Sequence, residues 1–214
     1  MPQLIVIGGW MTILLISATI SRRLWPNQQE LSRKIVHIGT GPIIPMAWWL
    51  KIPAAIAIPV AAMVTLIALI NHRWKLLGAV EDIHRNSYGT VAYGLSITIM
   101  LLLYWPTEAA AICAGVMVMA FGDGFAGLIG QRVNSPKWKF LNQTKSVAGT
   151  LTMAVISMAV LIGVNVLSNS GINLAGLLVI STLAMCLEQL SFWGIDNLSV
   201  PIGVAICWSS ITSN

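Results

Sequence analysis

The chain has 214 residues, of which 57% are hydrophobic and only 9% are charged. A soluble domain carries about 25% charged residues, so this composition excludes a soluble enzyme, a disordered tail and a disulfide scaffold. The net charge of +5 does not indicate nucleic-acid binding, because apolar runs separate the basic residues and no continuous basic stripe forms. The cysteines lie in apolar runs, as small buried residues do; they are Cys113, Cys186 and Cys207. We therefore expect an all-α polytopic membrane protein in the lipid bilayer, with one domain over residues 1–214.

In chain order, apolar runs predict seven transmembrane helices and a short eighth. A helix needs about 20 apolar residues to cross the hydrocarbon core. The predicted spans are Leu4–Ile20, Ile35–Leu50, Pro53–Ile70, Val91–Tyr104, Thr107–Gly130, Val147–Leu167, Ile172–Leu190 and Leu198–Ser210. The runs are continuous and do not alternate as the strands of a membrane barrel do, so strands are not expected.

Basic residues concentrate in every second connection between these spans. The basic connections hold Arg22, Arg23, Arg33 and Lys34, then Arg73, Lys75 and Arg85, then Arg132, Lys137, Lys139 and Lys145. The intervening connections hold only Lys51. Because cytoplasmic loops carry an excess of Lys and Arg, we expect the N-terminus outside and the three long loops in the cytoplasm. Most acidic residues and histidines lie on that same side, so any active site should face the cytoplasm.

The stretch from Gly122 to Arg132 holds an acid inside an apolar run. An acidic side chain at mid-bilayer costs about 2.5–3.5 kcal/mol on insertion scales, and such residues usually face a cavity or a partner. Asp123, Gly127 and Gly130 share one helical face. A carboxylate above a glycine-lined face predicts a site for Mg²⁺ and for phosphate oxygens. Close helix packing is the alternative for the glycines, but it does not account for Asp123.

The stretch from Lys145 to Thr150 opens the sixth predicted span. A lysine, two hydroxyls and Gly149 at a helix N-terminus predict a phosphate site, because free N–H groups and the helix dipole favour an anion there. The alternative is an ordinary N-cap by Ser146 beside a lysine that marks the cytoplasmic side.

Two further groups of polar residues lie on the predicted cytoplasmic side. Arg33 and Lys34 are placed to clamp phosphates, and His37 to accept a proton from an alcohol. The alternative is topology charges and a histidine hydrogen-bonded between helices, which is favoured for His37 taken alone. After the seventh span, the acids Glu188 and Asp196 lie without compensating basic residues, and Asn197 follows the second of them. They predict metal binding, pairing with basic loops elsewhere, or a polar turn. The loop acids Glu81 and Asp82 allow metal binding or a solvated loop face.

Together, four motifs resemble the membrane-embedded phytol and polyprenol kinases, which are relatives of dolichol kinase and, more distantly, of CDP-diacylglycerol synthase. The motifs are RKIVHIGTG at Arg33–Gly41, GDGFAGLIG at Gly122–Gly130, KSVAGT at Lys145–Thr150 and EQLSFWGIDNLSVPI at Glu188–Ile202. The resemblance covers Glu30 to Ile202. It implies a kinase in a bacterial or cyanobacterial membrane that phosphorylates an isoprenoid alcohol, with phytol preferred, using Mg²⁺ and CTP, with UTP possible.

The resemblance also assigns roles to residues of this chain. It implies catalytic roles for Asp123, His37 and Lys145. It implies metal ligation by Asp123, Glu188 and Asp196, and nucleotide or phosphate contacts by Arg33, Lys34, Gly124, Gly127, Lys145, Ser146, Gly149 and Asn197. The sequence departs from the family pattern at Ala148, where relatives often have Glu, and near Asn134, where they often have a further Gly. The first departure puts one metal or nucleotide contact in doubt, and Glu81 or Asp82 are candidates to replace it.

Two other functions stay open at this point. One is a CTP-dependent kinase or cytidylyltransferase that acts on a glycerolipid such as diacylglycerol or phosphatidate. The other is a small-solute transporter, because transporters also place polar sites among broken helices. The polar residues gather at one side and the chain has no inverted repeat, which argues against a transporter. The chain has no Walker A loop, nucleophile elbow, HExxH or CxxC motif, which argues against ATPases, covalent hydrolases and zinc proteases.

Overall fold

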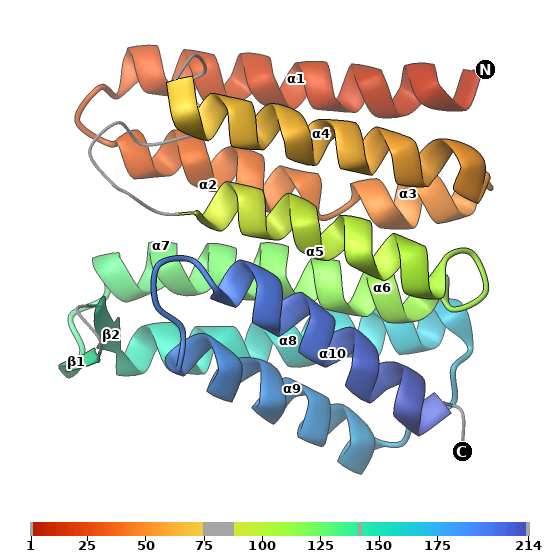
Figure 1. Ribbon diagram of the computed structural model, residues 1–214. Helices are drawn as coiled ribbons and strands as arrows, with labels where there is room; N and C mark the ends of the chain where they lie inside the picture. Colours follow the sequence, from red (N-terminus) through yellow and green to blue (C-terminus); the bar gives the residue numbers. More distant parts are fainter. Residues whose placement is uncertain (1, 75–87, 141–142, 213–214) are drawn as a thin grey trace.

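Helices run back and forth along one common axis in a computed structural model of the chain (Figure 1), which describes residues 2–74, 88–140 and 143–212. In chain order the elements are α1 (Pro2–Leu24), α2 (Gln29–Thr40), α3 (Ile43–Trp49), α4 (Ala54–Trp74), α5 (Gly89–Tyr104), α6 (Ala109–Met117), the π-helical turn η1 (Val118–Asp123), α7 (Gly124–Arg132), β1 (Lys137–Phe140), β2 (Gln143–Ser146), α8 (Val147–Ser168), α9 (Leu174–Gln189) and α10 (Asp196–Thr212). The prediction of an all-α bundle is confirmed, apart from one short hairpin.

Four stretches of the described chain are long and apolar enough to cross a membrane, and they fit a membrane protein. These stretches are α1, α4, α8 and the continuous rod α6–η1–α7. The apolar helices α5 and α9 are shorter, with 16 residues each. Each of these six elements overlaps a predicted span, and α10 overlaps the predicted eighth.

The predicted second span, Ile35–Leu50, is two helices instead of one. The helix α2 begins six residues earlier than predicted and ends at Thr40, and α3 begins at Ile43. Pro42 lies between them, and a proline lacks the N–H that would continue the helical hydrogen bonds. Gly41, which precedes Pro42, lies close to η1, because a Cβ at Gly41 would be 2.7 Å from the Cβ of Ala120. The break therefore falls where α2 crosses the central rod.

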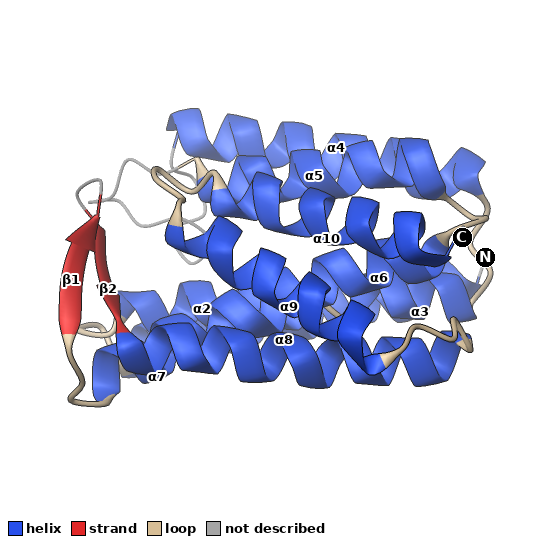
Figure 2. Cartoon of the chain, turned by 90° about the horizontal axis from the view of Figure 1, so that it is seen from below, coloured by secondary structure: helices blue, strands red, loops and turns tan. Residues whose placement is uncertain are grey.

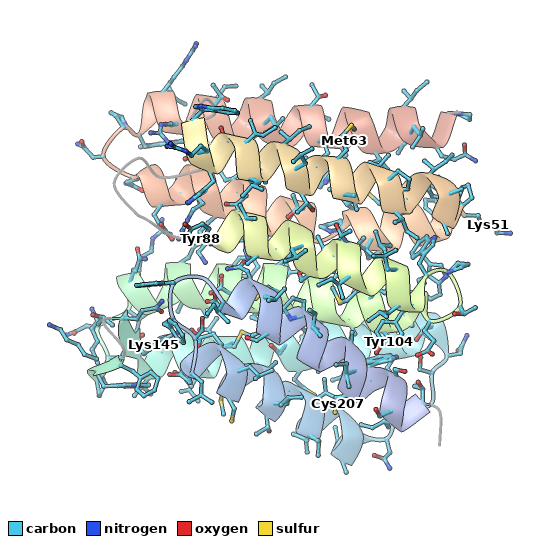
Figure 3. The ribbon with its side chains drawn as sticks, in the orientation of Figure 1. Lys51, Met63, Tyr88, Tyr104, Lys145 and Cys207 are labelled. Carbon is cyan, nitrogen blue, oxygen red and sulfur yellow. The ribbon has the colours of Figure 1, made fainter. Side chains whose placement is uncertain are left out.

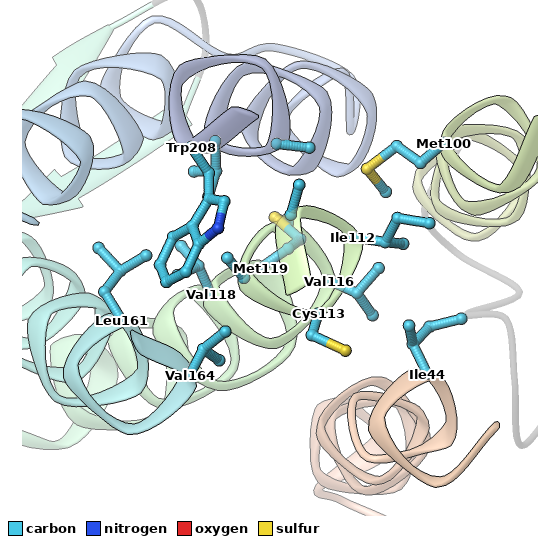
Figure 4. Close-up of a cluster of buried hydrophobic side chains, with 14 of the residues drawn as sticks. Ile44, Met100, Ile112, Cys113, Val116, Val118, Met119, Leu161, Val164 and Trp208 are labelled. Atoms are coloured by element: carbon cyan, nitrogen blue, oxygen red, sulfur yellow. The ribbon is translucent and has the colours of Figure 1, made fainter. Parts of the chain in front are cut away.

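The central rod of α6 and η1 carries the core. In the most apolar part of the rod Ala109–Arg132, 61% of the residues are buried, compared with 6% in that of α4. Figure 4 shows the surrounding packing, with side chains from α3, α5, α8 and α10 against the rod. The labelled residues from the rod are Ile112, Cys113, Val116, Val118 and Met119, and those from its neighbours are Ile44, Met100, Leu161, Val164 and Trp208. Small residues permit this closeness, because a side chain at Gly115 would overlap the backbone carbonyl of Pro201.

The outer helices α1 and α4 lie at the edge of the bundle. The helix α1 packs along α2. The indole N–H of Trp10 on α1 donates to the Gly39 carbonyl on α2 at 2.8 Å. The helix α4 packs along α5. Large aliphatic side chains on both helices remain exposed, among them Ile13 and Leu66, as expected for surfaces in contact with lipid.

The connection after α7 forms a hairpin that the sequence analysis did not predict. Strands β1 and β2 pair antiparallel, with Lys137 opposite Ser146 and Phe140 opposite Gln143. Figure 2 shows the hairpin projecting from one end of the bundle. Lysines alternate with aromatic residues along β1, and a period of two is the pattern of a strand. The expectation of no strands was wrong here because it rested on the long apolar runs and left this short polar stretch as a loop.

Candidate active site

A cavity of about 1080 Å³ opens at the end of the bundle that carries the hairpin. Segments far apart in the sequence meet there: the start of α2, the rod at Asp123, strand β2 and the turn between α9 and α10. The cavity is lined by Arg33, Lys34, His37, Asp123, Gly127, Lys145, Ser146, Gly149, Glu188, Asp196 and Asn197. Every residue to which the resemblance assigns a role is among them except Gly124, so the tertiary structure gathers the four motifs around one cavity.

Asp123 is bound to α2 by an ion pair. The Lys34 ammonium donates to Asp123 Oδ2 at 2.8 Å and to the Asp123 carbonyl at 3.1 Å. His37 Nε2 lies 3.4 Å from the same carboxylate oxygen and 3.2 Å from the Met119 carbonyl. All three side chains are mostly buried, at 7%, 19% and 14% exposure for Lys34, Asp123 and His37. Asp123 is therefore held by a lysine, and it also lines the hollow beside it.

The π-helical turn η1 ends at Asp123. A π-helical turn leaves some carbonyls without their usual helical partner, and such turns are frequent at functional sites. The Met119 carbonyl within η1 is the one that contacts His37. Although η1 departs from the regular helix that the sequence predicts here, Gly127 and Gly130 of α7 line the cavity together with Asp123.

The second half of the site is a lysine–glutamate pair. The Lys145 ammonium donates to the Glu188 carboxylate and, at 2.8 Å, to the Glu188 carbonyl. Gln189 Nε2 donates to the other oxygen of Glu188 at 2.8 Å and to Thr150 Oγ1 at 2.7 Å. Among the alternatives left open for Glu188, pairing with a basic loop is thus the one observed.

The N-terminus of α8 points into the same region. Ser146 Oγ accepts from the Gly149 N–H at 3.1 Å, so the N-cap proposed for Ser146 is present. A Cβ on Gly130 would lie 2.8 Å from Ser146 Oγ and 3.2 Å from the Gly149 Cα. The α7 and α8 backbones thus meet closely at the cavity wall, and the packing and phosphate-site interpretations apply to the same glycines.

Two other glycines of the motif differ from each other. A Cβ on Gly127 would lie 2.9 Å from Lys34 Cε, so its missing side chain leaves room for the lysine that reaches Asp123. Gly124 does not line the cavity; it is buried against the Ile38 side chain of α2, where a Cβ would lie 2.9 Å from Cδ1. This contact favours helix packing as the role of Gly124.

Asp196 begins α10 after a tight turn, in which Gly194 has φ +87°. Asp196 is 9% exposed, and its Oδ1 accepts from the Asn197 N–H at 3.0 Å and from Asn197 Nδ2 at 3.1 Å. Within the described part of the chain no lysine or arginine comes within 4.0 Å of this carboxylate. Asp196 is therefore the cavity acid whose charge has no ion-pair partner there.

The cavity carboxylates are oxygen ligands of the kind that Mg²⁺ takes in proteins. Among the described residues no three His, Cys, Asp or Glu side chains lie close enough to hold a metal by themselves. Magnesium does not require such a cage, because it is usually bound by one or two carboxylates, waters and substrate phosphates. Asp123 and Asp196 line the same cavity, and each keeps one oxygen outside the bonds described above.

Comparison with known proteins decides the family. The chain is 37% identical to the phytol kinase of Synechocystis sp. over 98% of its own length and 93% of the relative's. The chain belongs to the phytol kinase family. It is also 30% identical to a probable phytol kinase 1, chloroplastic, of Glycine max, over 92% of the chain and 72% of the relative. A farnesol kinase, chloroplastic, of Arabidopsis thaliana is 28% identical over 83% of the chain and 64% of the relative. No family model and no solved structure matched the chain.

In this phytol kinase family member, the cavity also contains polar residues that the motifs did not indicate. Tyr93 lines it from α5, 5.0 Å from the His37 ring between centroids, and its hydroxyl donates to the Val116 carbonyl at 3.3 Å. Thr40 and Asn71 line it too. Tyr93 is a polar aromatic residue in an apolar run, which is a weak signal in the sequence, and only the tertiary structure places it beside His37.

Four residues named for the connection between α4 and α5 fall outside the described residues: Lys75, Glu81, Asp82 and Arg85. Ala148, the position named above as a departure from the family pattern, is half-buried, and its N–H donates to Ser135 Oγ at 3.2 Å. Arg33 lines the cavity but pairs with Glu30 one turn earlier, at 2.5 Å.

Proposed function

We propose that the chain is a kinase that transfers the γ-phosphoryl group of CTP, or of UTP, to the hydroxyl of an isoprenoid alcohol, with phytol as the preferred acceptor and Mg²⁺ as the metal. One observation carries the proposal: a single cavity joins a charged end to an apolar arm between apolar helices. A nucleotide is soluble in water and phytol in lipid, so an enzyme that joins them needs this combination in one site.

The charged end suits a nucleoside triphosphate. Lys34, Lys145 and Arg33 supply positive charge, and the α8 N-terminus supplies backbone N–H groups beside Gly149. Each of the three cations is paired with a carboxylate, so the site is close to neutral before the substrate binds. Phosphate oxygens would compete for the lysines and leave the carboxylates of Asp123 and Glu188 available for a cation.

Asp123 and Asp196 would hold Mg²⁺, with Glu188 as a third candidate. Bound Mg²⁺ would neutralise negative charge on the phosphate oxygens, which is the chemistry that phosphoryl transfer needs most. The Asp196 carboxylate has no cation partner among the described residues and is mostly buried, so the approach of a cation would lower the cost of burying its charge.

The transfer itself forms one bond and breaks one. The alcohol oxygen attacks the γ-phosphorus, and the bond from that phosphorus to the β–γ bridging oxygen breaks with its electron pair on the departing nucleoside diphosphate. The hydroxyl proton passes to a base at the cavity, and His37 is the candidate. If Nε2–H donates to the Met119 carbonyl, Nδ1 is the free acceptor. Lys34 and Lys145 would stabilise charge on the moving phosphoryl group.

We propose that seven or eight helices cross the membrane with the N-terminus outside and the site in the cytoplasm. Figure 3 shows Lys145 and Lys51 at opposite ends of the bundle. Most basic residues lie at the Lys145 end, including Arg22, Arg132 and the lysines of the hairpin. The positive-inside rule then supports a cytoplasmic orientation for the cavity mouth.

The test is an assay of purified protein with phytol, Mg²⁺ and labelled nucleotides. We expect phytyl phosphate and CDP, and we expect Asp123→Asn to abolish turnover while membrane insertion is unchanged. Release of pyrophosphate, with transfer of the cytidylyl group, would instead support a cytidylyltransferase. Turnover of diacylglycerol but not of phytol would support a glycerolipid kinase. Normal turnover by Asp123→Asn would remove the role proposed for the acid.

A further inference from the structure

The apolar arm of the cavity is a groove along four helices. It runs from the charged end between α1 and α3 on one side and α4 and α5 on the other. On α4 its lining residues recur with the helical period from Ile56 through Ala57, Val60 and Ala61 to Asn71. Asn71 comes fifteen residues after Ile56, so the groove is about 22 Å long at 1.5 Å per residue.

One long side of the groove is open. The helix α1 packs along α2, and α4 packs along α5, so each outer helix is attached to a different neighbour and the groove lies between them. Groove residues on α4 are exposed accordingly: Val60 is 41% exposed, Val64 46% and Ile67 48%. All three are aliphatic, and in a membrane this side meets lipid chains.

The end of the groove away from the charges is closed. Ile44, Ile52 and Leu101 form it, at 4%, 5% and 2% exposure. The position of Ile52 is fixed by its backbone, because its N–H donates to the Ala47 carbonyl at 3.0 Å and its carbonyl accepts from the Trp105 indole N–H at 3.0 Å. The closed end is thus built of buried side chains on an anchored backbone.

The length of the groove matches one class of isoprenoid chain. An extended C20 prenyl alcohol has a main chain of about 16 carbons and is about 20 Å long, since each C–C bond of about 1.5 Å advances a zigzag chain by somewhat less. A C15 alcohol is about 15 Å long by the same reasoning and would leave the closed end empty. A C25 alcohol would exceed the groove.

We infer that this groove holds the isoprenoid tail, that the tail enters sideways between α1 and α4, and that the closed end at Ile52 and Leu101 sets the longest chain that the enzyme accepts. The inference rests on the proposed function for the position of the hydroxyl at the charged end. It adds the residues that select among alcohols, none of which belongs to the four motifs.

Paired variants test the chain-length limit in the full-length protein. Leu101→Ala lengthens the groove, whereas Leu102→Ala removes the same atoms from an exposed neighbour that does not line it. We expect Leu101→Ala to raise kcat/KM for a C25 alcohol relative to a C20 alcohol by about tenfold. We expect Leu102→Ala to leave the ratio within about twofold. Equal ratios in the wild type and both variants would overturn the inference.

A second pair shortens the groove. Ala57→Phe places a ring in it, and Ala55→Phe places the same ring on the exposed side of α4. We expect Ala57→Phe to lower kcat/KM for phytol at least tenfold more than for farnesol, with no such split for Ala55→Phe. Equal losses for both alcohols in Ala57→Phe would contradict a tail in this groove.

Binding can be tested without turnover. A phytol analogue with a diazirine at the tail end should label the closed end, at Ile52 or Leu101, after irradiation of the wild-type protein in liposomes, and excess phytol should suppress the labelling. Labelling only at exposed residues such as Leu102, or labelling suppressed equally by phospholipid acyl chains, would overturn the inference. A protein that shows specific labelling but no phosphorylation would refute the proposed function and retain the groove.

Discussion

Loss of the Lys34 cation should destabilise the protein, and loss of both partners of its ion pair should not. In Lys34→Met the Asp123 carboxylate stays in place, 19% exposed, without the ammonium that lies 2.8 Å from it. Among the residues that the structure describes, His37 Nε2 at 3.4 Å is then the ionisable nitrogen beside this carboxylate. The double variant Lys34→Met/Asp123→Asn removes the buried charges together and keeps similar side-chain volumes.

The size of the effect follows from the geometry. Two unit charges at 2.8 Å attract with about 6 kcal/mol at an effective dielectric constant of about 20, and the cost of desolvation offsets much of this. Removing one partner of a buried pair costs about 3–5 kcal/mol. Because Asp123 faces a cavity, we expect a loss of about 3 kcal/mol in the free energy of unfolding, which is about 6–12 °C in Tm for a chain of this size.

Thermal unfolding in detergent, with activity measured on the same samples, provides the test. The double variant should regain at least half of the loss in Tm but show no turnover, because both groups belong to the proposed site. Lys139→Met, at an exposed position on β1, is the matched control and should change Tm by no more than about 2 °C, since surface substitutions fall within about 0.5 kcal/mol. A double variant no more stable than Lys34→Met, or one that keeps wild-type turnover, would refute the reasoning.

Three further outcomes follow from individual contacts. Asp196→Asn should lower kcat at least about 100-fold and raise the Mg²⁺ concentration needed for half-maximal rate. Its Tm should change little, because no described cation is paired with this acid, and an unchanged Mg²⁺ titration would contradict its role. His37→Gln should lower kcat by about 10²–10⁴-fold with a similar KM for phytol, and a loss confined to KM would contradict its role as base. Gly130→Ala should lower Tm, because the added Cβ would lie 2.8 Å from Ser146 Oγ. Gly163→Ala, whose added Cβ would meet no atom within 4 Å, should raise the free energy of unfolding by up to about 1 kcal/mol. Equal changes in Tm for the two variants in differential scanning fluorimetry would contradict the packing argument.

Residue types and their order along the chain were enough to predict a helical membrane protein and to name most of the charged residues that line the cavity. Long apolar runs with few charges leave helices as the way to satisfy backbone hydrogen bonds in lipid, so the helical fold was predictable, although the second predicted span is two helices and the hairpin was not predicted. The acid at Asp123 was conspicuous because an ionisable group in such a run is costly. Local signals were sufficient for the Ser146 cap as well.

Which of those residues pair with one another depends on the packing of the helices. Lys34 reaches Asp123 across 89 positions of sequence and Lys145 reaches Glu188 across 43, and such pairings depend on which helices pack together, which no local period records. The apolar groove is likewise invisible in the sequence, because Leu101 and Leu102 are identical residues in one apolar run. They differ only in the direction that each side chain faces, and that direction follows from how α5 packs against α4 and the core. The physical reason is that the neighbouring helices decide which side chains face a cavity and which face lipid.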